Sequence, residues 1–323
     1  MDLILPATPA GQRIMTGIGC GIGAGALWGL VFLAPELVRA FTPLQLAIGR
    51  YLAYGLLSAA LIAPRWHMLI GALGRREWIA LGWLALTGNT LYYILLSNAV
   101  QTGGIAMTSL VIGFLPVVVT IVGSRERGAL SLAALAPSLA LCGAGALCIG
   151  WQALVAPRPA AAGHGLAGLL CALGALGSWA VFAVGNSRWL TRLPSMPVQD
   201  WNLLTGLVTG VQAMALIPLT LAFEPIRHDA TDWLLFAGVS TGVALFCSIM
   251  GNALWNRMSR LLPLTMVGQM ILFETLFALL YGFLWERRLP TALETAAFAL
   301  VVLSVLSCIA AHRREAAGQL SAA

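Results

Sequence analysis

Charge is the scarcest property of this sequence. Only 9% of its 323 residues are charged, and all 18 basic residues are arginine, because lysine is absent. A soluble globular domain carries about 25% charged residues, whereas 59% of this chain is hydrophobic. The composition therefore excludes an ordinary soluble protein and indicates a membrane protein.

Several catalytic and metal-binding motifs are also missing. The sequence has no HExxH motif, no phosphate-binding glycine loop and no pair of carboxylates within one apolar run. Its six cysteines lie in apolar segments without metal-ligand spacing, and the arginines behind its net charge of +6 are scattered between those segments. We therefore expect no enzymatic activity, no cofactor, no metal site and no nucleic-acid partner.

Long uncharged runs fill most of the chain. Several exceed the roughly 20 residues that a helix needs to cross the hydrocarbon core, and the run 78–124 is long enough for two crossings with a turn at 98–104. We predict an all-α polytopic membrane protein. Its ten predicted transmembrane helices are 15–34, 43–63, 78–96, 103–123, 131–150, 165–187, 200–223, 233–255, 263–284 and 290–311.

An internal duplication organises these helices. The stretches 98–127 and 256–288 each open with asparagine, continue through an apolar span and reach a Glu-Arg pair near the end. Trp28 also matches Trp179 at an offset of 151 residues. Because five helices per copy is an odd number, the copies must cross the membrane in opposite senses. We therefore predict two inverted-topology repeats, an architecture of secondary transporters that bind substrate near the bilayer midplane.

The placement of arginine predicts the orientation of the chain. With the N-terminus inside, 12 arginines lie on the inner side and five on the outer side, while Arg50 lies within a span. This bias follows the positive-inside rule and places both termini in the cytoplasm of a bacterial cell, with the protein in the inner membrane. The predicted parts are a cytoplasmic tail at 1–14, a first repeat at 15–150, a periplasmic linker at 151–164, a second repeat at 165–311 and a cytoplasmic tail at 312–323.

Several motifs resemble one transporter family. These are Ala26-Leu27-Trp28-Gly29 in the first span, Phe114-Leu115-Pro116-Val117 opposite Leu272-Phe273-Glu274-Thr275, and the Glu-Arg pair after each fourth span. Together with the duplication they resemble the EamA-like branch of the drug/metabolite transporter (DMT) superfamily, and within it the chain looks most like the YddG-type aromatic amino acid exporters. The resemblance implies a secondary transporter that exports small hydrophobic or aromatic amino acids and related metabolites by alternating access.

The resemblance implies a small-molecule substrate, namely an amino acid or metabolite. The composition implies the lipid bilayer as the second partner, and a monomeric state is expected. Two alternatives stay open: an importer or exchanger of another small metabolite, and a membrane scaffold or sensor that binds a ligand without moving it.

Arg50 and Glu274 are the ionisable residues predicted to lie well inside spans. Each charged side chain costs roughly 2.5–3.5 kcal/mol at the centre of a membrane helix, so neither should face lipid. Their predicted depths are close enough for a salt bridge. Three interpretations stay open: a structural ion pair, contacts to the carboxylate and ammonium of an amino acid, and proton transport by Glu274.

Aromatic and amide side chains recur on single helix faces near these two residues. An apolar pocket with a few polar groups suits a ligand with an aromatic or aliphatic side chain. The predicted cavity lining is Trp28, Arg50, Asn89, Tyr92, Tyr93, Trp179, Trp255, Asn256, Gln269, Met270 and Glu274. Tryptophans near span ends are instead predicted to be interfacial anchors, namely Trp78, Trp151, Trp201, Trp233 and Trp285.

A glycine stripe marks the first span. Gly17, Gly21, Gly25 and Gly29 recur every four residues and leave one face of the helix bare. Small residues at this spacing let helices approach closely in lipid. The stripe predicts either a tight static contact or a surface on which the helix slides during transport.

Overall fold

The computed structural model describes residues 10–125, 130–155, 165–223, 228–287 and 289–322. Every regular element in these ranges is helical. The elements are α1 (Ala10–Gly29), η1 (Leu30–Phe32), α2 (Ala34–Leu37), α3 (Pro43–Ile62), η2 (Ala63–Arg65), α4 (Trp66–Ala72), α5 (Arg75–Ala85), η3 (Leu86–Thr90), α6 (Leu91–Ile112), α7 (Leu115–Gly123), α8 (Leu132–Val155), α9 (Gly165–Arg192), α10 (Val198–Phe223), α11 (Ala230–Val243), η4 (Ala244–Gly251), α12 (Asn252–Leu261), α13 (Leu264–Met270), α14 (Leu272–Glu286) and α15 (Ala292–Ala322).

Local sequence signals fix several helix starts. Thr42 precedes α3 and forms a capping box, in which its hydroxyl accepts from the Gln45 amide and the Gln45 side chain accepts from the Thr42 amide. Pro43 follows at the first helical position, where its missing N–H costs nothing. Asp229 caps α11 in the same way by accepting from the Asp232 amide. These caps satisfy backbone donors that would otherwise be unpaired at the membrane boundary.

Within the described residues, eight segments are long and apolar enough to cross a membrane: Gly11–Leu37, Pro43–Gly71, Arg75–Thr102, Leu166–Arg192, Val198–Ala222, Ala230–Leu261, Leu264–Trp285 and Ala292–Glu315. A shorter apolar helix, Leu132–Cys148, lies in α8. The protein is therefore an all-α polytopic membrane protein.

The turn predicted at 98–104 is wrong as a break between helices, because α6 continues through it from Leu91 to Ile112. That helix is not straight, however. Val111 belongs to the same small apolar cluster as Ala99 and Ala172, whereas a straight helix would carry it about 18 Å beyond Ala99 at 1.5 Å per residue. The chain therefore changes direction within α6, without a loop between two helices.

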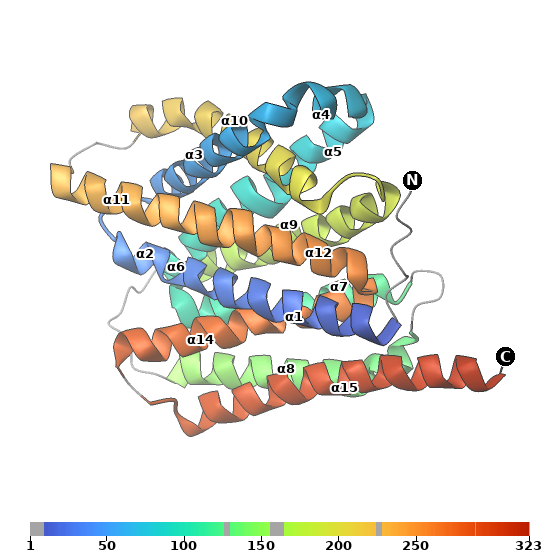
Figure 1. The fold of residues 1–323 in the computed structure, drawn as a ribbon. Coiled ribbons are helices and arrows are strands. Elements are labelled where there is room, and N and C mark those ends of the chain that lie inside the picture. The colour runs from blue at the N-terminus through green and yellow to red at the C-terminus, as the bar shows by residue number, and fades with distance from the viewer. Residues whose placement is uncertain (1–9, 126–129, 156–164, 224–227, 288, 323) are drawn as a thin grey trace.

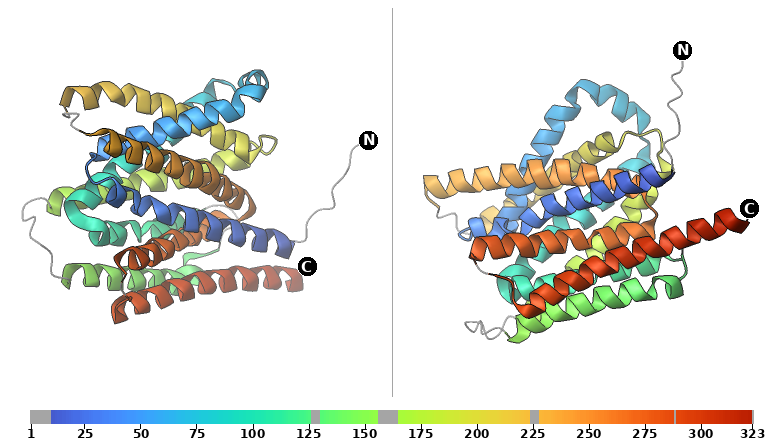
Figure 2. Two further views of the ribbon diagram at one scale, coloured as in Figure 1. Left: turned by 60° about the vertical axis from the view of Figure 1, so that its left-hand side comes forward. Right: turned by 60° about the horizontal axis from the view of Figure 1, so that its bottom comes forward.

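The long helices form one bundle (Figure 1). Helices α8 and α15 pack side by side at one edge, and α3 and α10 pack at the opposite edge, with α1, α6 and α9 between them (Figures 1 and 2). The contact between α3 and α10 is close because Gly55 faces Gly210, where an added Cβ would lie 2.6 Å from the opposing Cα. Small residues thus let the backbones approach, as is common between helices in lipid.

The glycine stripe of α1 packs against the second half of the chain. A Cβ added at Gly25 would lie 2.5 Å from the Cβ of Phe273 and 2.8 Å from the backbone nitrogen of Glu274. At Gly21 the neighbours are Met258 and Met270. This arrangement shows the predicted close contact, while sliding of the helix stays a prediction.

Other predictions need correction at the ends of helices. The linker predicted at 151–164 begins as helix because α8 continues to Val155, and the tail predicted at 312–323 is helical to Ala322. Residues 1–9 and 156–164, like the Glu-Arg pair at 126–127, lie outside the described residues. Trp201 is not an interfacial anchor, because it is fully buried and its indole N–H donates to Asn186 Oδ1 at 3.0 Å.

Candidate functional site

Two π-helical segments interrupt the membrane helices at related positions. These segments are η3 and η4, and their first residues, Leu86 and Ala244, are 158 residues apart. The helix interruptions before α7 and α14 repeat this spacing, since Gly113 and Ile271 are also 158 residues apart. π-Helical segments are rare and frequently occur at functional sites. The four irregularities therefore form two pairs, with one member of each pair in each half of the chain.

Side chains of other helices donate hydrogen bonds to carbonyls of these π-helical segments. In η3, Thr87 O accepts from Ser178 Oγ at 2.7 Å and Asn89 O accepts from Tyr51 Oη at 3.0 Å. In η4, Cys247 O accepts from Trp28 Nε1 at 3.0 Å and Ile249 O accepts from Asn202 Nδ2 at 3.0 Å. Carbonyls that leave the regular helical pattern in lipid need such partners.

A small cavity lies beside the two π-helical segments, and the buried side chains of Arg50 and Glu274 both line it. Its volume is about 20 Å³, which is room for one water molecule but not for an amino acid. Both halves of the chain contribute to it. The lining residues are Trp28, Val31, Arg50, Tyr51, Gly88, Asn89, Tyr92, Trp179, Phe182, Asn252 and Glu274.

Arg50 lies in a polar and aromatic environment. The side chain is 7% exposed, and its Nε donates to Ser248 Oγ in η4 at 3.2 Å. Its guanidinium carbon lies 4.5 Å from the ring centroid of Tyr93 and 5.1 Å from that of Tyr51. Stacking on aromatic faces stabilises a desolvated cation. These contacts hold the guanidinium at the cavity, and no acidic side chain of the described residues forms an ion pair with it.

Glu274 reaches the same cavity from the first turn of α14. A carboxylate is favoured there because the helix N-terminus carries a partial positive charge. No ion pair of 4.0 Å or less joins Glu274 to Arg50 in the described ranges. Of the three interpretations, the structural ion pair is therefore not formed in this conformation. Instead, the cation and the carboxylate line one cavity separately.

Three tryptophans form an aromatic cluster at this site. The ring of Trp28 lies 5.8 Å from that of Trp179 and 5.0 Å from that of Trp255, and Trp179 lies 5.1 Å from Trp255. Trp28 and Trp179 line the cavity, while Trp255 packs behind them. The Trp255 indole is buried, and its N–H has no hydrogen-bond partner among the described residues. A buried donor without a partner costs about 1–3 kcal/mol.

Some predicted lining residues lie elsewhere. Asn256 accepts a hydrogen bond from Asn186 at 2.7 Å, and Gln269 is bonded to Thr120 and Ser304, away from the cavity. Met270 packs on the glycine stripe of α1. Six of the eleven predicted residues do line the cavity: Trp28, Arg50, Asn89, Tyr92, Trp179 and Glu274. Tyr93 instead supports Arg50 from outside the lining.

The remaining lining residues were not among the predicted ones. The sequence could have predicted Phe182 and Asn252, because each lies three residues from a predicted lining tryptophan and so shares its helix face. For Tyr51 and Gly88 the sequence offers no indication beyond their position next to Arg50 and Asn89. Gly88 lies in η3 and Tyr51 of α3 donates to Asn89 O of η3, so both positions depend on the backbone of η3, which the sequence does not reveal.

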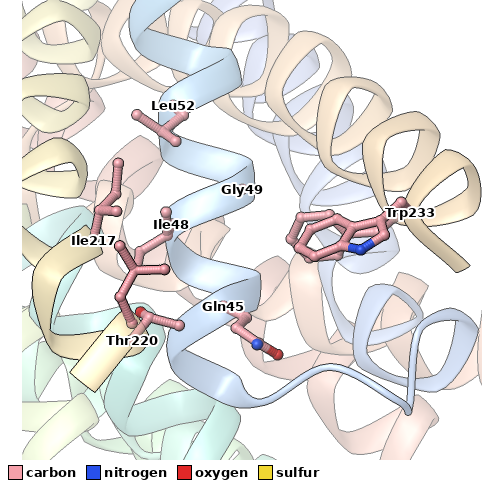
Figure 3. A pocket seen from close by; sticks show the side chains of 9 residues that line it. Gln45, Ile48, Gly49, Leu52, Ile217, Thr220 and Trp233 are labelled. Atoms are coloured by element: carbon pink, nitrogen blue, oxygen red, sulfur yellow. The ribbon is translucent and has the colours of Figure 1, made fainter. Parts of the chain in front are cut away.

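A second cavity of about 190 Å³ lies on the outside of α3 (Figure 3). Figure 3 shows Gly49 facing Trp233 on one side of α3, with Ile48 and Leu52 toward Ile217 on the other. Its lining is almost entirely apolar, and Trp233 is 39% exposed at its edge. This groove therefore has no charged group with which to hold a zwitterionic substrate.

The sequence Gly238-Val239-Ser240-Thr241-Gly242 matches the G-x-S-x-G pattern of serine hydrolases. In those enzymes the serine sits on a sharp strand-to-helix turn. Here the whole pattern lies inside α11. It therefore lacks the backbone geometry of a nucleophile elbow.

Similarity to known proteins covers nearly the whole chain. No family model matches it. The chain is 31% identical over 319 residues to the inner membrane protein YtfF of Escherichia coli (strain K12), covering 92% of this chain and 96% of YtfF. A solved crystal structure superposes with a TM-score of 0.68 at 18% identity, covering 91% of this chain and 98% of the other. At 18% identity the superposition shows that the two proteins share a fold and shows nothing about function.

Proposed function

Because the chain belongs to the family of the Escherichia coli inner membrane protein YtfF, we propose that it is a secondary transporter of the inner membrane that exports small hydrophobic or aromatic amino acids and related metabolites. One observation carries the proposal. A single buried cavity combines the cation of Arg50, the carboxylate of Glu274 and the aromatic rings of Trp28, Tyr92 and Trp179.

This lining matches an amino acid in both its charges and its side chain. Arg50 would bind the substrate carboxylate, and Glu274 would bind its ammonium group, since the two side chains do not neutralise each other directly. Asn89 and Asn252 supply further polar groups, and the tryptophans would pack against an apolar side chain. The direction of transport comes from the resemblance to the EamA-like exporters of the DMT superfamily.

We further propose ten membrane crossings in two inverted five-helix repeats, with both termini in the cytoplasm. The paired π-helical segments and the paired interruptions before α7 and α14 support a duplication, because each pair has the same spacing of 158 residues. The bend within α6 supports two crossings between residues 75 and 123. Discontinuous helices near the midplane are typical of such transporters.

The size of the cavity supports alternating access. With a volume of about 20 Å³, the cavity cannot hold an amino acid, so the two halves would separate to admit one. Each separation would expose the cavity to one side of the membrane. The helix interruptions and π-helical segments are the places where the helices would bend.

Efflux from proteoliposomes tests this function. Full-length protein is reconstituted with internal radiolabelled phenylalanine, and efflux is compared with that from empty liposomes and from an Arg50→Gln variant. We expect efflux that phenylalanine analogues inhibit and that the variant loses. External unlabelled phenylalanine would accelerate efflux by an exchanger, and an imposed pH gradient would change the rate if Glu274 carries a proton.

Two results would contradict the proposal and favour one of the two alternatives. Flux only of other metabolites would favour the importer or exchanger of a different substrate. Saturable binding of phenylalanine by the folded protein, without flux in either direction, would favour a membrane scaffold or sensor.

A further inference from the structure

An amphipathic groove lies between α5 and α9 at one end of the bundle, well apart from the cavity described above. Its volume is about 790 Å³. The residues that line it are Arg76, Glu77, Ile79, Ala80, Trp83, Trp189, Arg192 and Leu193. We refer to it as the α5–α9 groove.

Both arginines of the groove lie at the ends of segments that are long and apolar enough to cross a membrane. Arg76 is the second residue of the apolar segment Arg75–Thr102, and Arg192 is the last residue of the segment Leu166–Arg192. The two helices run antiparallel, and Leu84 of α5 contacts Gly185 of α9, where an added Cβ would lie 3.1 Å from Leu84 Cδ2. This register brings the two guanidinium groups to the same level of the bilayer.

The carboxylate of Glu77 does not cancel this positive charge completely. Its Oε2 accepts a hydrogen bond from the Gly74 amide at 2.9 Å and so caps the start of α5. The lining still carries two cations and one anion. The N-terminus of α5, an 11-residue helix, adds partial positive charge at the same place.

Apolar and aromatic groups continue the groove toward the membrane interior. Ile79 and Trp83 follow Arg76 on one face of α5 and are 62% and 57% exposed. Trp83 lies about 10 Å deeper than Arg76 at 1.5 Å per residue. On α9 the Arg192 guanidinium stacks on Trp189, 5.5 Å from its ring centroid. The groove is therefore cationic at the bilayer edge and apolar below it.

We propose that the α5–α9 groove binds one anionic phospholipid. The lipid phosphate would lie between Arg76 and Arg192, and one acyl chain would run along Ile79 and Trp83. A soluble anion would use the arginines but not the exposed apolar face, whereas a zwitterionic lipid would use the face but gain less from the cations. Basic pockets between membrane helices bind anionic headgroups for these reasons.

Native mass spectrometry of the full-length protein in neutral detergent tests the proposal. The protein is titrated with dioleoylphosphatidylglycerol and separately with dioleoylphosphatidylcholine. Each arginine near a membrane surface contributes about 1 kcal/mol to the binding of anionic lipid, so Arg76→Gln should weaken phosphatidylglycerol binding about fivefold and Arg76→Gln/Arg192→Gln about 25-fold. The double variant Arg76→Lys/Arg192→Lys, which keeps both charges, should retain most of the binding.

Arg313→Gln/Arg314→Gln is the matched control, because it removes two exposed arginines from α15, also at the end of an apolar segment. It should change phosphatidylglycerol binding less than twofold. Equal binding of phosphatidylcholine, or an equal loss in the control, would overturn the proposal. Full competition by inorganic phosphate at millimolar concentration would also overturn it and indicate a site for a free anion.

Discussion

Two tryptophans of the aromatic cluster should respond differently to the same substitution. Trp28 donates its indole N–H to Cys247 O at 3.0 Å, while the N–H of Trp255 has no partner among the described residues. Both indoles are buried, with exposed fractions of 7% and 1%, and their rings are 5.0 Å apart. Replacing either with phenylalanine leaves a void of similar size, so the packing penalty nearly cancels when the two variants are compared.

The difference in stability between the two variants then measures the contribution of the Trp28 hydrogen bond. Trp28→Phe loses a bond worth about 1 kcal/mol, or up to about 3 kcal/mol if the carbonyl finds no other donor. Trp255→Phe loses no bond and removes a buried donor that lacked a partner. At about 2.1 cal/mol/K per residue, the unfolding entropy of this 323-residue chain is about 0.7 kcal/mol/K, so 1 kcal/mol shifts the melting temperature by about 1.5 °C. We expect Trp28→Phe to melt about 1.5–4.5 °C below Trp255→Phe.

Thermal unfolding of the purified protein in detergent, followed by size-exclusion chromatography after heating, measures this difference. Equal melting temperatures, or a lower one for Trp255→Phe, would refute the reasoning, because the Trp255 N–H would then have a partner such as a bound water. In the efflux assay Trp255→Phe has a second use. A tenfold loss of transport without a loss of stability would indicate that this N–H donates to the substrate.

Three further substitutions test other parts of the structure. Gly25→Ala should destabilise the protein by about 1–3 kcal/mol because its Cβ would overlap the backbone at Glu274, whereas Gly19→Ala, with no atom within 4 Å, should not lower the melting temperature. Arg65→Gln should destabilise the protein by about 3 kcal/mol because it leaves buried Asp200, now paired at 2.7 Å, without a cation, and Asp200→Asn should cost less in the same unfolding assay. Glu274→Gln should leave the melting temperature nearly unchanged but reduce phenylalanine efflux at least tenfold, and unchanged efflux would exclude a role in substrate or proton binding.

The sequence predicted the class of fold because membrane helices can be identified from the length and composition of their apolar runs. The burial of Arg50 and Glu274 was predictable for a related reason, since an ionisable residue in an apolar run is costly in lipid and therefore faces the interior of the bundle. Their missing ion pair was not predictable. Depth along a helix says how far a side chain lies from the surface, but the rotation of the helix decides which neighbour it meets.

Helix irregularities explain most of the remaining errors. The residues of η3 and η4 have no composition that separates a π-helical segment from an α-helix. The sequence therefore did not predict that Gly88 of η3 lines the cavity, nor that Tyr51 of α3, which donates to η3, lies beside it. Trp201 shows a second limit. From the sequence, a tryptophan near the end of an apolar run is predicted to be an interfacial anchor. The same position is compatible with a buried tryptophan that donates to a buried asparagine, as Trp201 does.

The bonds to the π-helical segments have a consequence for the balance between conformations that open toward opposite sides of the membrane. Trp28 to Cys247 and Ser178 to Thr87 each join one half of the chain to the other, and each is a single hydrogen bond from a side chain to a carbonyl. In the transport that we propose, opening toward either side of the membrane would break one such bond, so the two open states would lose similar stabilisation from this pair. These two bonds then favour neither open state over the other.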